Sequence, residues 1–483
     1  MAVAEAIGTA EHYQISARIE RLPFSRWHMK MGLIVATGWF FDGFDALAIA
    51  YVLPVLIPMW HLNFAQIGFL ISAGYIGQLI GSIFFGWLGE KIGRVPVFRY
   101  TLILYTIMSV ACGFATTYDA LVWMRVIQGL GLGGEIPILA AYIGEFAKAT
   151  HRGRYGLGFQ LWFSISFIFV SGISYFVVPH WGWEAMFFIG AIPAVILLPM
   201  RAFMPESPRW LANKGRYVEA DAILTKIEDD ISEHGAKPLP PIPTDVAPVK
   251  PSTARFTDLL SGIYRKRTLA VWTIWFCTYI IVYGLNTTVP SLLRTVYHAS
   301  LEQSIIYGFF ASGLGLCFTV TGIFFIDKYG RKPLFALGQL CSAIPLLLLA
   351  YYSAPTMNII AVMGLAMLAS AFNSILALGL STYNAELYPT EMRALGVGVG
   401  NAWVRLAAVI GPIFLGWAIP NIGLNNAYAV YAVFGIIGGL TVILFAVETK
   451  GKVLELLSPS LQRDGEKATA LSTASATPGS HPH

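Results

Sequence analysis

The chain has 483 residues, of which 56% are hydrophobic and only 12% charged, and its formal net charge is +5. This composition excludes an ordinary soluble fold, which carries more charge and less apolar material, and indicates that lipid surrounds most of the chain. Crossing about 30 Å of hydrocarbon takes roughly 20 apolar residues in a helix, so the length suits about a dozen spans and leaves little chain for a separate soluble domain.

The first 27 residues are polar and charged. They contain no short apolar core followed by small residues, so we expect no cleavable signal peptide. The cysteines fall inside apolar stretches and lack the spacing of a metal site, so we expect neither disulfides nor a zinc centre. They are Cys112, Cys277, Cys317 and Cys341.

Apolar runs between charged or Gly/Pro-rich breaks predict an all-α integral membrane protein with twelve transmembrane helices. The predicted spans are 29–58, 65–89, 96–117, 119–146, 155–178, 183–203, 268–296, 303–326, 333–352, 357–386, 391–419 and 426–447. A long polar segment with a helix-like stretch, GRYVEADAILTKIEDDI, divides them six and six. The predicted organisation is therefore a tail at 1–28, a six-helix half at 29–204, a linker at 205–267, a second six-helix half at 268–449 and a tail at 450–483.

The distribution of Lys and Arg predicts the orientation, because basic flanks are retained in the cytoplasm. Of the 32 such residues, only Arg294 lies on the face with the odd-numbered loops, and Arg125 and Arg405 lie within spans. The others share one face with both termini, which predicts that this face is cytoplasmic. Basic loops also account for the positive net charge, so we expect no nucleic-acid partner.

The two predicted halves resemble each other. EKIGRVPVF at 90–98 and DKYGRKPLF at 327–335 match at the acid, Lys, Gly, Arg, Pro and Phe, each after the second span of its half. Further charged positions recur in register: Glu145 and Arg152 with Glu386 and Arg393, and Glu206 with Glu448. Duplicated six-helix halves are the construction of a large class of transporters, so we expect two pseudo-symmetric halves here.

Motifs in both halves carry a resemblance to the major facilitator superfamily that covers nearly the whole chain. The loop pattern G-x3-[DE]-[KR]-x-G-R is met at 86–94, with Glu90 in place of the usual Asp, and the span-four pattern R-x2-Q-G-x-G-x-G is met at 125–133. PESPRWL at 205–211, ELYPTEMR at 386–393 and ETKG at 448–451 resemble the branch of sugar porters, organic ion transporters, synaptic vesicle glycoproteins and bacterial aromatic-acid symporters.

FDGFD at 41–45, with Pro54 in the same span, is similar to the aromatic-acid and nicotinate-type symporters more than to the sugar porters. The resemblance implies a secondary transporter in the bacterial inner membrane that works by alternating access as a monomer, without cofactor or metal. An enzyme has no support: the glycines of GLGLGG at 129–134 sit within a span and predict close helix packing, and no nucleophile and base stand together.

Charges at the cytoplasmic helix ends predict a gate. Opposite charges that pair there would latch the halves together, and a network of them biases two states that differ by a few kcal/mol. The alternative is that they only solubilise loop ends. The predicted gate residues are Glu90, Arg94, Glu145, Arg152, Glu206, Asp327, Arg331, Glu386, Arg393 and Glu448.

Five ionisable residues fall inside predicted spans, namely Asp42, Asp45, Arg125, Glu135 and Arg405. A charge near mid-bilayer costs roughly 2.5 to 3.5 kcal/mol, so these side chains should face a cavity or a partner. Asp45 stands where proton-coupled sugar porters similarly carry an Asp facing the span-four Arg, which corresponds to Arg125. The resemblance implies that protonating Asp45 releases Arg125; a static pair is the alternative, and Asp42 and Glu135 are alternative proton carriers.

Arg405 lies near mid-depth in the eleventh span, seven residues before Pro412. Organic anion transporters similarly place an Arg at this spacing, whereas organic cation transporters place an Asp. A guanidinium donates two parallel hydrogen bonds to a carboxylate, so we expect a small organic anion as substrate. The alternative is that Arg405 pairs internally with a carboxylate such as Glu135.

Polar and aromatic residues near mid-depth complete the predicted substrate site: Tyr283, Asn286, Asn373, Tyr383, Gln160 and Trp162. The leading hypothesis is proton-coupled uptake of an aromatic or nicotinate-like carboxylate, with protons and membrane lipid as the other partners. A sugar or neutral metabolite porter is a second hypothesis, and a non-transporting membrane receptor on the same fold is a third.

Overall fold

The computed structural model describes residues 14–146, 152–202, 204–234, 238–243, 255–352 and 358–450, which are helical with short connections and form no strand. The helices of the first half are α2 (Arg26–Trp60), α3 (Phe64–Ile92), α4 (Arg94–Gly113), α5 (Tyr118–Phe146), α6 (Arg152–Trp181) and α7 (Glu184–Ala202). The connecting segment holds α8 (Pro208–Asn213), α9 (Tyr217–His234) and α10 (Phe256–Leu259). The second half holds α11 (Gly262–Thr295), α12 (Leu301–Tyr329), α13 (Arg331–Tyr352), α14 (Ile359–Ser374), α15 (Leu376–Glu386), α16 (Thr390–Ile422) and α17 (Leu424–Phe445).

The predicted all-α fold with twelve transmembrane helices in two halves is confirmed. Within the described residues, eleven helical stretches are long and apolar enough to cross a membrane, with α14 and α15 together forming one of them. The 19-residue α7 fills the sixth position of the first half. Two details differ from the prediction: the tenth span is divided at Ile375, and α11 begins at Gly262, inside the segment predicted as linker.

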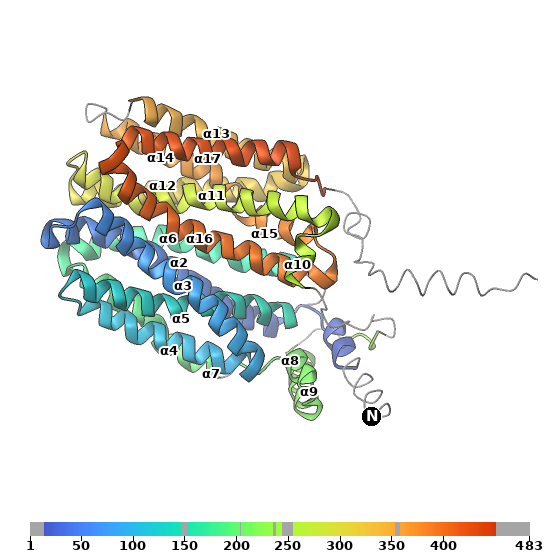
Figure 1. The fold of residues 1–483 in the computed structure, drawn as a ribbon. Coiled ribbons are helices and arrows are strands. Elements are labelled where there is room, and N and C mark those ends of the chain that lie inside the picture. The colour runs from blue at the N-terminus through green and yellow to red at the C-terminus, as the bar shows by residue number, and fades with distance from the viewer. Residues whose placement is uncertain are drawn as a thin grey trace, which may run out of the picture.

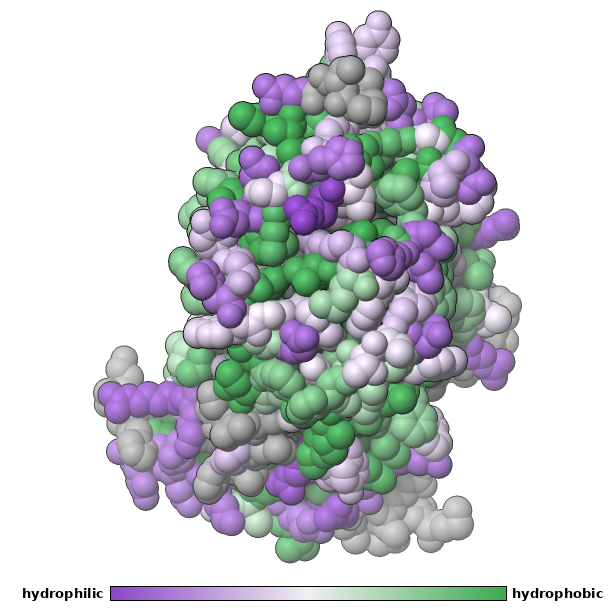
Figure 2. Space-filling model, turned by 90° about the vertical axis from the view of Figure 1, so that its left-hand side faces the viewer, coloured by the Kyte–Doolittle hydropathy of each residue, from purple (hydrophilic) through white to green (hydrophobic). Residues whose placement is uncertain are grey.

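The long helices lie side by side, and α8, α9 and the N-terminal segment gather at one end of the bundle (Figure 1). We call this the linker end, and the opposite end, where α2 stops at Trp60 and α3 starts at Phe64, the far end. Figure 2 shows the molecule from the side of the far end, with hydrophilic and hydrophobic residues interspersed. Large apolar side chains such as Ile83, Phe324 and Leu444 are instead 67–74% exposed on the helices, as lipid contact allows.

The N-terminal segment at 14–21 is helical and lies against the connecting helices at the linker end. Ile15 and Ile19 pack with Leu211 and Leu224, and the Arg18 guanidinium donates to the Glu228 carboxylate at 2.8 Å. Residues 1–13 and 451–483 of the two predicted tails lie outside the described residues.

Glycines, which have no side chain, let α3 and α5 approach each other very closely. A Cβ added to Gly129 would lie 2.1 Å from the carbonyl oxygen of Gly74, and one added to Gly133 would lie 2.1 Å from that of Gln78. No larger residue fits these positions, so the glycine run in α5 is used for helix packing. The approach sets the position of Gln78 relative to Arg125.

Three helix pairs make most of the contact between the halves in the described part of the chain: α2 with α11, α3 with α16, and α6 with α12. Ser72 of α3 donates its hydroxyl to the Val409 carbonyl of α16 at 2.7 Å. Nearer the far end, a Cβ on Gly416 would lie 2.5 Å from the Phe64 carbonyl oxygen. The halves are therefore in direct backbone contact between the middle of the bundle and the far end.

Candidate functional site

An ion pair whose carboxylate accepts hydrogen bonds on both oxygens lies inside the first half. Arg125 of α5 donates to both carboxylate oxygens of Asp45 on α2, at 2.9 and 2.8 Å. The Gln128 amide donates to the same carboxylate at 2.8 Å and to the Ser109 hydroxyl at 3.0 Å. Both charged residues are 2% exposed. Charge-assisted bonds of this kind offset the cost of burying both ions, so the pair is held firmly in place.

A second, looser pair crosses between the halves. The Arg405 guanidinium of α16 donates to the Gln78 amide oxygen of α3, and its other terminal nitrogen lies 3.8 Å from an oxygen of Asp42 on α2. That distance is too long for a hydrogen bond. Asp42 is 1% exposed, and neither of its carboxylate oxygens has a hydrogen-bond partner. Two opposite charges thus face each other across the interface without being tightly joined.

Glu135 lies on α5 and is 3% exposed. Its charge acts on Asp42, so the middle of the bundle holds three carboxylates and two guanidinium groups within electrostatic reach of one another. The expected internal alternative for Arg405 was a carboxylate such as Glu135; the carboxylate found within ion-pair distance is Asp42.

Aromatic rings form a wall beside this site. On α11, Trp275, Tyr279 and Tyr283 follow one another at four-residue intervals and stack, with centroid distances of 5.5 and 5.9 Å. Tyr75 of α3 meets Tyr283 edge-on at 5.1 Å, so the wall extends across both halves. The Arg405 charge acts on the hydroxyls of Tyr75, Tyr279 and Tyr283, so the guanidinium lies within electrostatic reach of these rings.

Four other predicted substrate residues make their described contacts with residues outside this site. Asn286 accepts a hydrogen bond from Ser370, and Asn373 donates to the Ala369 carbonyl within its own helix. Tyr383 lies on α15, where its hydroxyl donates to the carbonyl of Val447 and accepts from the backbone N–H of the same residue. Trp162 packs edge-on against Phe40, at 6.4 Å. The side chain of Gln160 lies outside the part of the structure that is described.

Sequence reasoning missed Gln78 and Tyr75 as members of the site. Gln78 is fully buried in α3, and Tyr75 is 2% exposed one turn earlier. The available signal was the amide of Gln78 inside an apolar span, because an uncharged polar side chain also needs a partner there.

At the linker end of the first half, Arg94 organises the charged residues. Its guanidinium donates to Glu145 and to Glu90, both at 2.8 Å. Glu206 accepts the backbone N–H groups of Arg94 and Val95, at 3.0 and 3.2 Å, where α4 begins. A carboxylate is stabilised at that position because a helix N-terminus carries partial positive charge and free N–H groups.

The second half repeats this arrangement. Arg331 donates to Glu386 at 3.0 Å, and Glu448 accepts the backbone N–H groups of Arg331 and Lys332 where α13 begins, at 3.1 and 2.9 Å. The two capping carboxylates differ in protonation behaviour. Burial raises the pKa of Glu206, whereas in Glu448 the bound backbone N–H groups outweigh the effect of burial and lower the pKa.

These contacts join helices within one half. The predicted gate residues are thus brought together in two separate groups, and Arg393 is half-buried in the first turn of α16. The side chains of Arg152 and Asp327 lie outside the described part of the chain.

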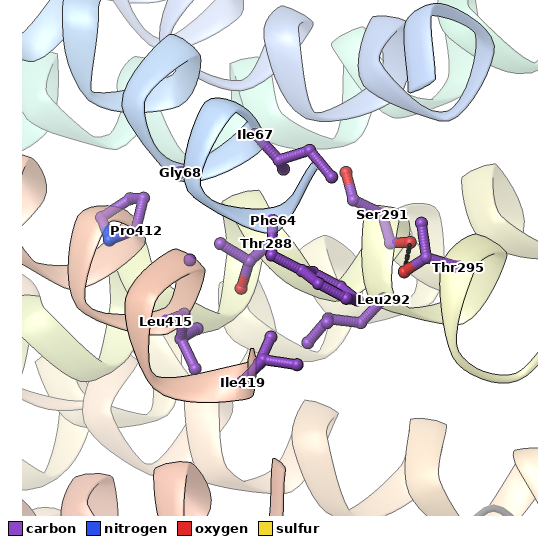
Figure 3. Close-up of a pocket in the computed structure, with 11 residues that line it drawn as sticks. Phe64, Ile67, Gly68, Thr288, Ser291, Leu292, Thr295, Pro412, Leu415 and Ile419 are labelled. Carbon is purple, nitrogen blue, oxygen red and sulfur yellow. Dashed lines mark hydrogen bonds between the residues drawn. The ribbon is translucent and has the colours of Figure 1, made fainter. Parts of the chain in front are cut away.

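A small pocket opens between α3, α11 and α16 toward the far end (Figure 3). It is lined by Phe64, Ile67, Gly68, Thr288, Ser291, Leu292, Thr295, Pro412, Leu415, Gly416 and Ile419. Its lining carries hydroxyl and apolar groups but no charge, so it is separate from the charged centre of the bundle.

The sequence pattern of the sugar (and other) transporter family matches residues 31–461, most of the chain. The chain belongs to this family of the major facilitator superfamily. A niacin transporter, NiaP, of Acinetobacter baylyi is 31% identical over 444 residues, covering 91% of this chain and 98% of the relative. A benzoate transport protein of the same bacterium is 26% identical over 432 residues, covering 88% and 91%.

Solved structures agree with this membership at the level of the fold. The xylose transporter XylE from E. coli, in a partially occluded inward open conformation, matches with a TM-score of 0.67 at 23% identity, covering 89% of this chain and 100% of that chain. The chain is therefore a multi-pass membrane transporter of a small molecule, and it is not an enzyme, as predicted.

Proposed function

We propose that this transporter imports a small aromatic or nicotinate-like carboxylate together with protons, by alternating access across the inner membrane of a bacterium. The observation that carries the proposal is the position of Arg405, a cation at the interface of the halves within electrostatic reach of a wall of aromatic rings. The guanidinium suits a carboxylate and the rings suit a flat apolar body. Relatives named for niacin and benzoate support the same class of substrate.

Proton coupling rests on the carboxylates around the two guanidinium groups. Asp42, Asp45 and Glu135 outnumber Arg125 and Arg405, so an anionic substrate enters a site that already carries excess negative charge. Burying a further unpaired anion costs several kcal/mol, and uptake of a proton removes that cost. Transport of a proton together with the substrate follows from this balance.

The linker end faces the cytoplasm in this proposal, and its two charge groups form the cytoplasmic gate. The contacts of Arg94 and Arg331 hold the helix ends of each half together, so each half moves as one body. The basic loops support the orientation. A monomer surrounded by lipid is the working unit, because both halves of the proposed site come from one chain.

A second candidate is a sugar or neutral metabolite porter, which the family's description and the PESPRWL and ETKG motifs favour. It differs in one measurable respect. A neutral substrate does not need the Arg405 charge, so its binding would survive Arg405→Leu, whereas carboxylate binding would not.

The test is a thermal-unfolding screen of the purified protein against benzoate, nicotinate, aliphatic carboxylates, the matching amides, sugars and organic cations. A substrate at about 100 times its dissociation constant adds about 2.7 kcal/mol to the stability of the folded state. We expect benzoate or nicotinate to stabilise the parent and the control Arg294→Leu, but not Arg405→Leu. If sugars stabilise the parent and both variants while carboxylates have no effect, the proposed substrate class is wrong.

Transport is then measured in proteoliposomes. Radiolabelled carboxylate should accumulate when the outside is more acidic than the inside, and a protonophore should abolish the accumulation. Binding without accumulation would contradict proton-coupled import.

A further inference from the structure

The two aspartates of α2 have opposite surroundings, although they lie three residues apart. Asp45 accepts hydrogen bonds from Arg125 and Gln128 within its own half. Asp42 is just as deeply buried, yet its oxygens accept none. A buried carboxylate without hydrogen bonds is costly to keep ionised, so Asp42 depends on the Arg405 charge across the interface.

We propose that Asp42 occupies Arg405 in the place of the substrate carboxylate, and that a substrate which binds Arg405 displaces Asp42 and causes it to take up a proton. The inference rests on the proposed function and assigns the coupling proton to a residue. Asp45 stays paired with Arg125 throughout and acts as a fixed part of the scaffold.

The geometry gives three reasons. The 3.8 Å separation between Arg405 and Asp42 is ion-pair distance without a hydrogen bond, so no hydrogen bond is broken when Asp42 leaves. The guanidinium is held from its other side by Gln78, so it remains in position while its partner changes. A substrate carboxylate makes two short hydrogen bonds that Asp42 does not make here, and so competes successfully.

The charge balance closes with one proton. Before binding, Asp42 is ionised opposite Arg405; after binding, the substrate anion takes that place and Asp42 becomes a neutral acid with a proton drawn from water. The net charge of the buried site is unchanged, which avoids adding an unpaired anion to the low-dielectric interior.

The surroundings of Asp42 favour protonation once Arg405 is lost. Glu135 from α5 and Asp45 from α2 add negative charge, and Arg405 from α16 is the cation that acts most strongly on it. The hydroxyls of Tyr75 from α3 and Tyr283 from α11 are also within electrostatic reach of Asp42. On α6, Ser166 and Phe163 pack against this turn of α2 at Gly43.

The experiment measures proton uptake when benzoate binds to detergent-solubilised protein in weak buffer with a pH indicator. The parent and the control Asp119→Asn, a change at an exposed position of α5, should take up close to one proton per benzoate bound. Asp42→Asn should bind benzoate at least as tightly and take up none, because the competing charge is gone. Asp42→Glu should restore uptake.

A second measurement needs no variant. Between about pH 6 and pH 8, where a free carboxylate stays ionised, the affinity of the parent for benzoate should rise toward tenfold per unit fall in pH, whereas any binding of benzamide should not change. Proton uptake that persists in Asp42→Asn, or a pH-independent affinity for benzoate, would overturn the assignment while leaving carboxylate transport intact. Failure of the parent to bind any carboxylate would overturn both proposals.

Discussion

Asp45 and Asp42 face two guanidinium groups from the same stretch of α2, and the pairs they form are built for different tasks. The pair of Asp45 with Arg125 lies within one half and satisfies its carboxylate. The pair of Asp42 with Arg405 crosses between halves and leaves its carboxylate without hydrogen bonds. A charge pair inside a rigid body stabilises that body, whereas one between two bodies can open when they move or when a ligand competes. The contrast teaches that equal burial does not mean equal surroundings, because the two carboxylates differ in the completeness of their hydrogen bonds.

The largest effect on stability should come from breaking the ion pair of Asp45 with Arg125. Asp45→Asn leaves the Arg125 charge buried without its partner, which costs about 3–5 kcal/mol of stability. Thermal unfolding in detergent should show a large fall in Tm, partly recovered in Asp45→Asn/Arg125→Gln, where both charges are gone. An unchanged Tm in the single variant would remove the distinction between the two pairs.

Replacing each arginine by lysine sharpens the comparison. Arg405→Lys keeps the charge but loses the planar fork, so benzoate affinity should fall about tenfold, or about 1.4 kcal/mol, with little change in Tm. Arg125→Lys should instead lower the Tm and leave the affinity for benzoate almost unchanged, because it disrupts hydrogen bonds inside the first half. Isothermal titration and thermal unfolding of both variants give the two readouts, and equal effects on both would contradict separate roles.

A smaller effect is expected at Gln78. Gln78→Leu removes the acceptor that holds Arg405, and the guanidinium then moves toward Asp42, so benzoate binding should weaken by about 1 kcal/mol. In an Asp42→Asn background the loss should shrink, since residues that share a partner are not additive. Ser72→Ala, which removes another hydrogen bond between α3 and α16, is the control. Additive losses would show that Gln78 does not act through Arg405.

The smallest effect concerns the shape of the substrate. Tyr283→Leu removes a ring that stacks on Tyr279 and meets Tyr75, so benzoate and nicotinate should lose about 0.5–1.5 kcal/mol of binding while a short aliphatic carboxylate loses less. Titration of both ligands measures the difference. Equal losses would place the aromatic body of the substrate elsewhere.

Much of the fold could be predicted from the sequence because hydropathy and charge act locally. Each predicted span corresponds to one helix, except the tenth, which corresponds to α14 and α15, and the polar stretch GRYVEADAILTKIEDDI contributes most of α9. The break at Ile375 was missed because the apolar run continues through it. Tyr383, predicted for the substrate site, bonds instead to Val447, and this contact depends on how the chain after α17 returns to α15.

The sequence by itself determined that the chain is a twelve-helix membrane transporter with repeated halves, and which five ionisable residues lie within the spans, because the cost of placing a charge in lipid restricts residue types position by position. The tertiary structure alone decided the partners. That Glu206 caps α4 and Glu448 caps α13, and that Asp42 rather than Glu135 is the carboxylate within ion-pair distance of Arg405, follows from helix rotation and from close contacts between residues far apart in the chain. No periodicity along a single helix contains that information.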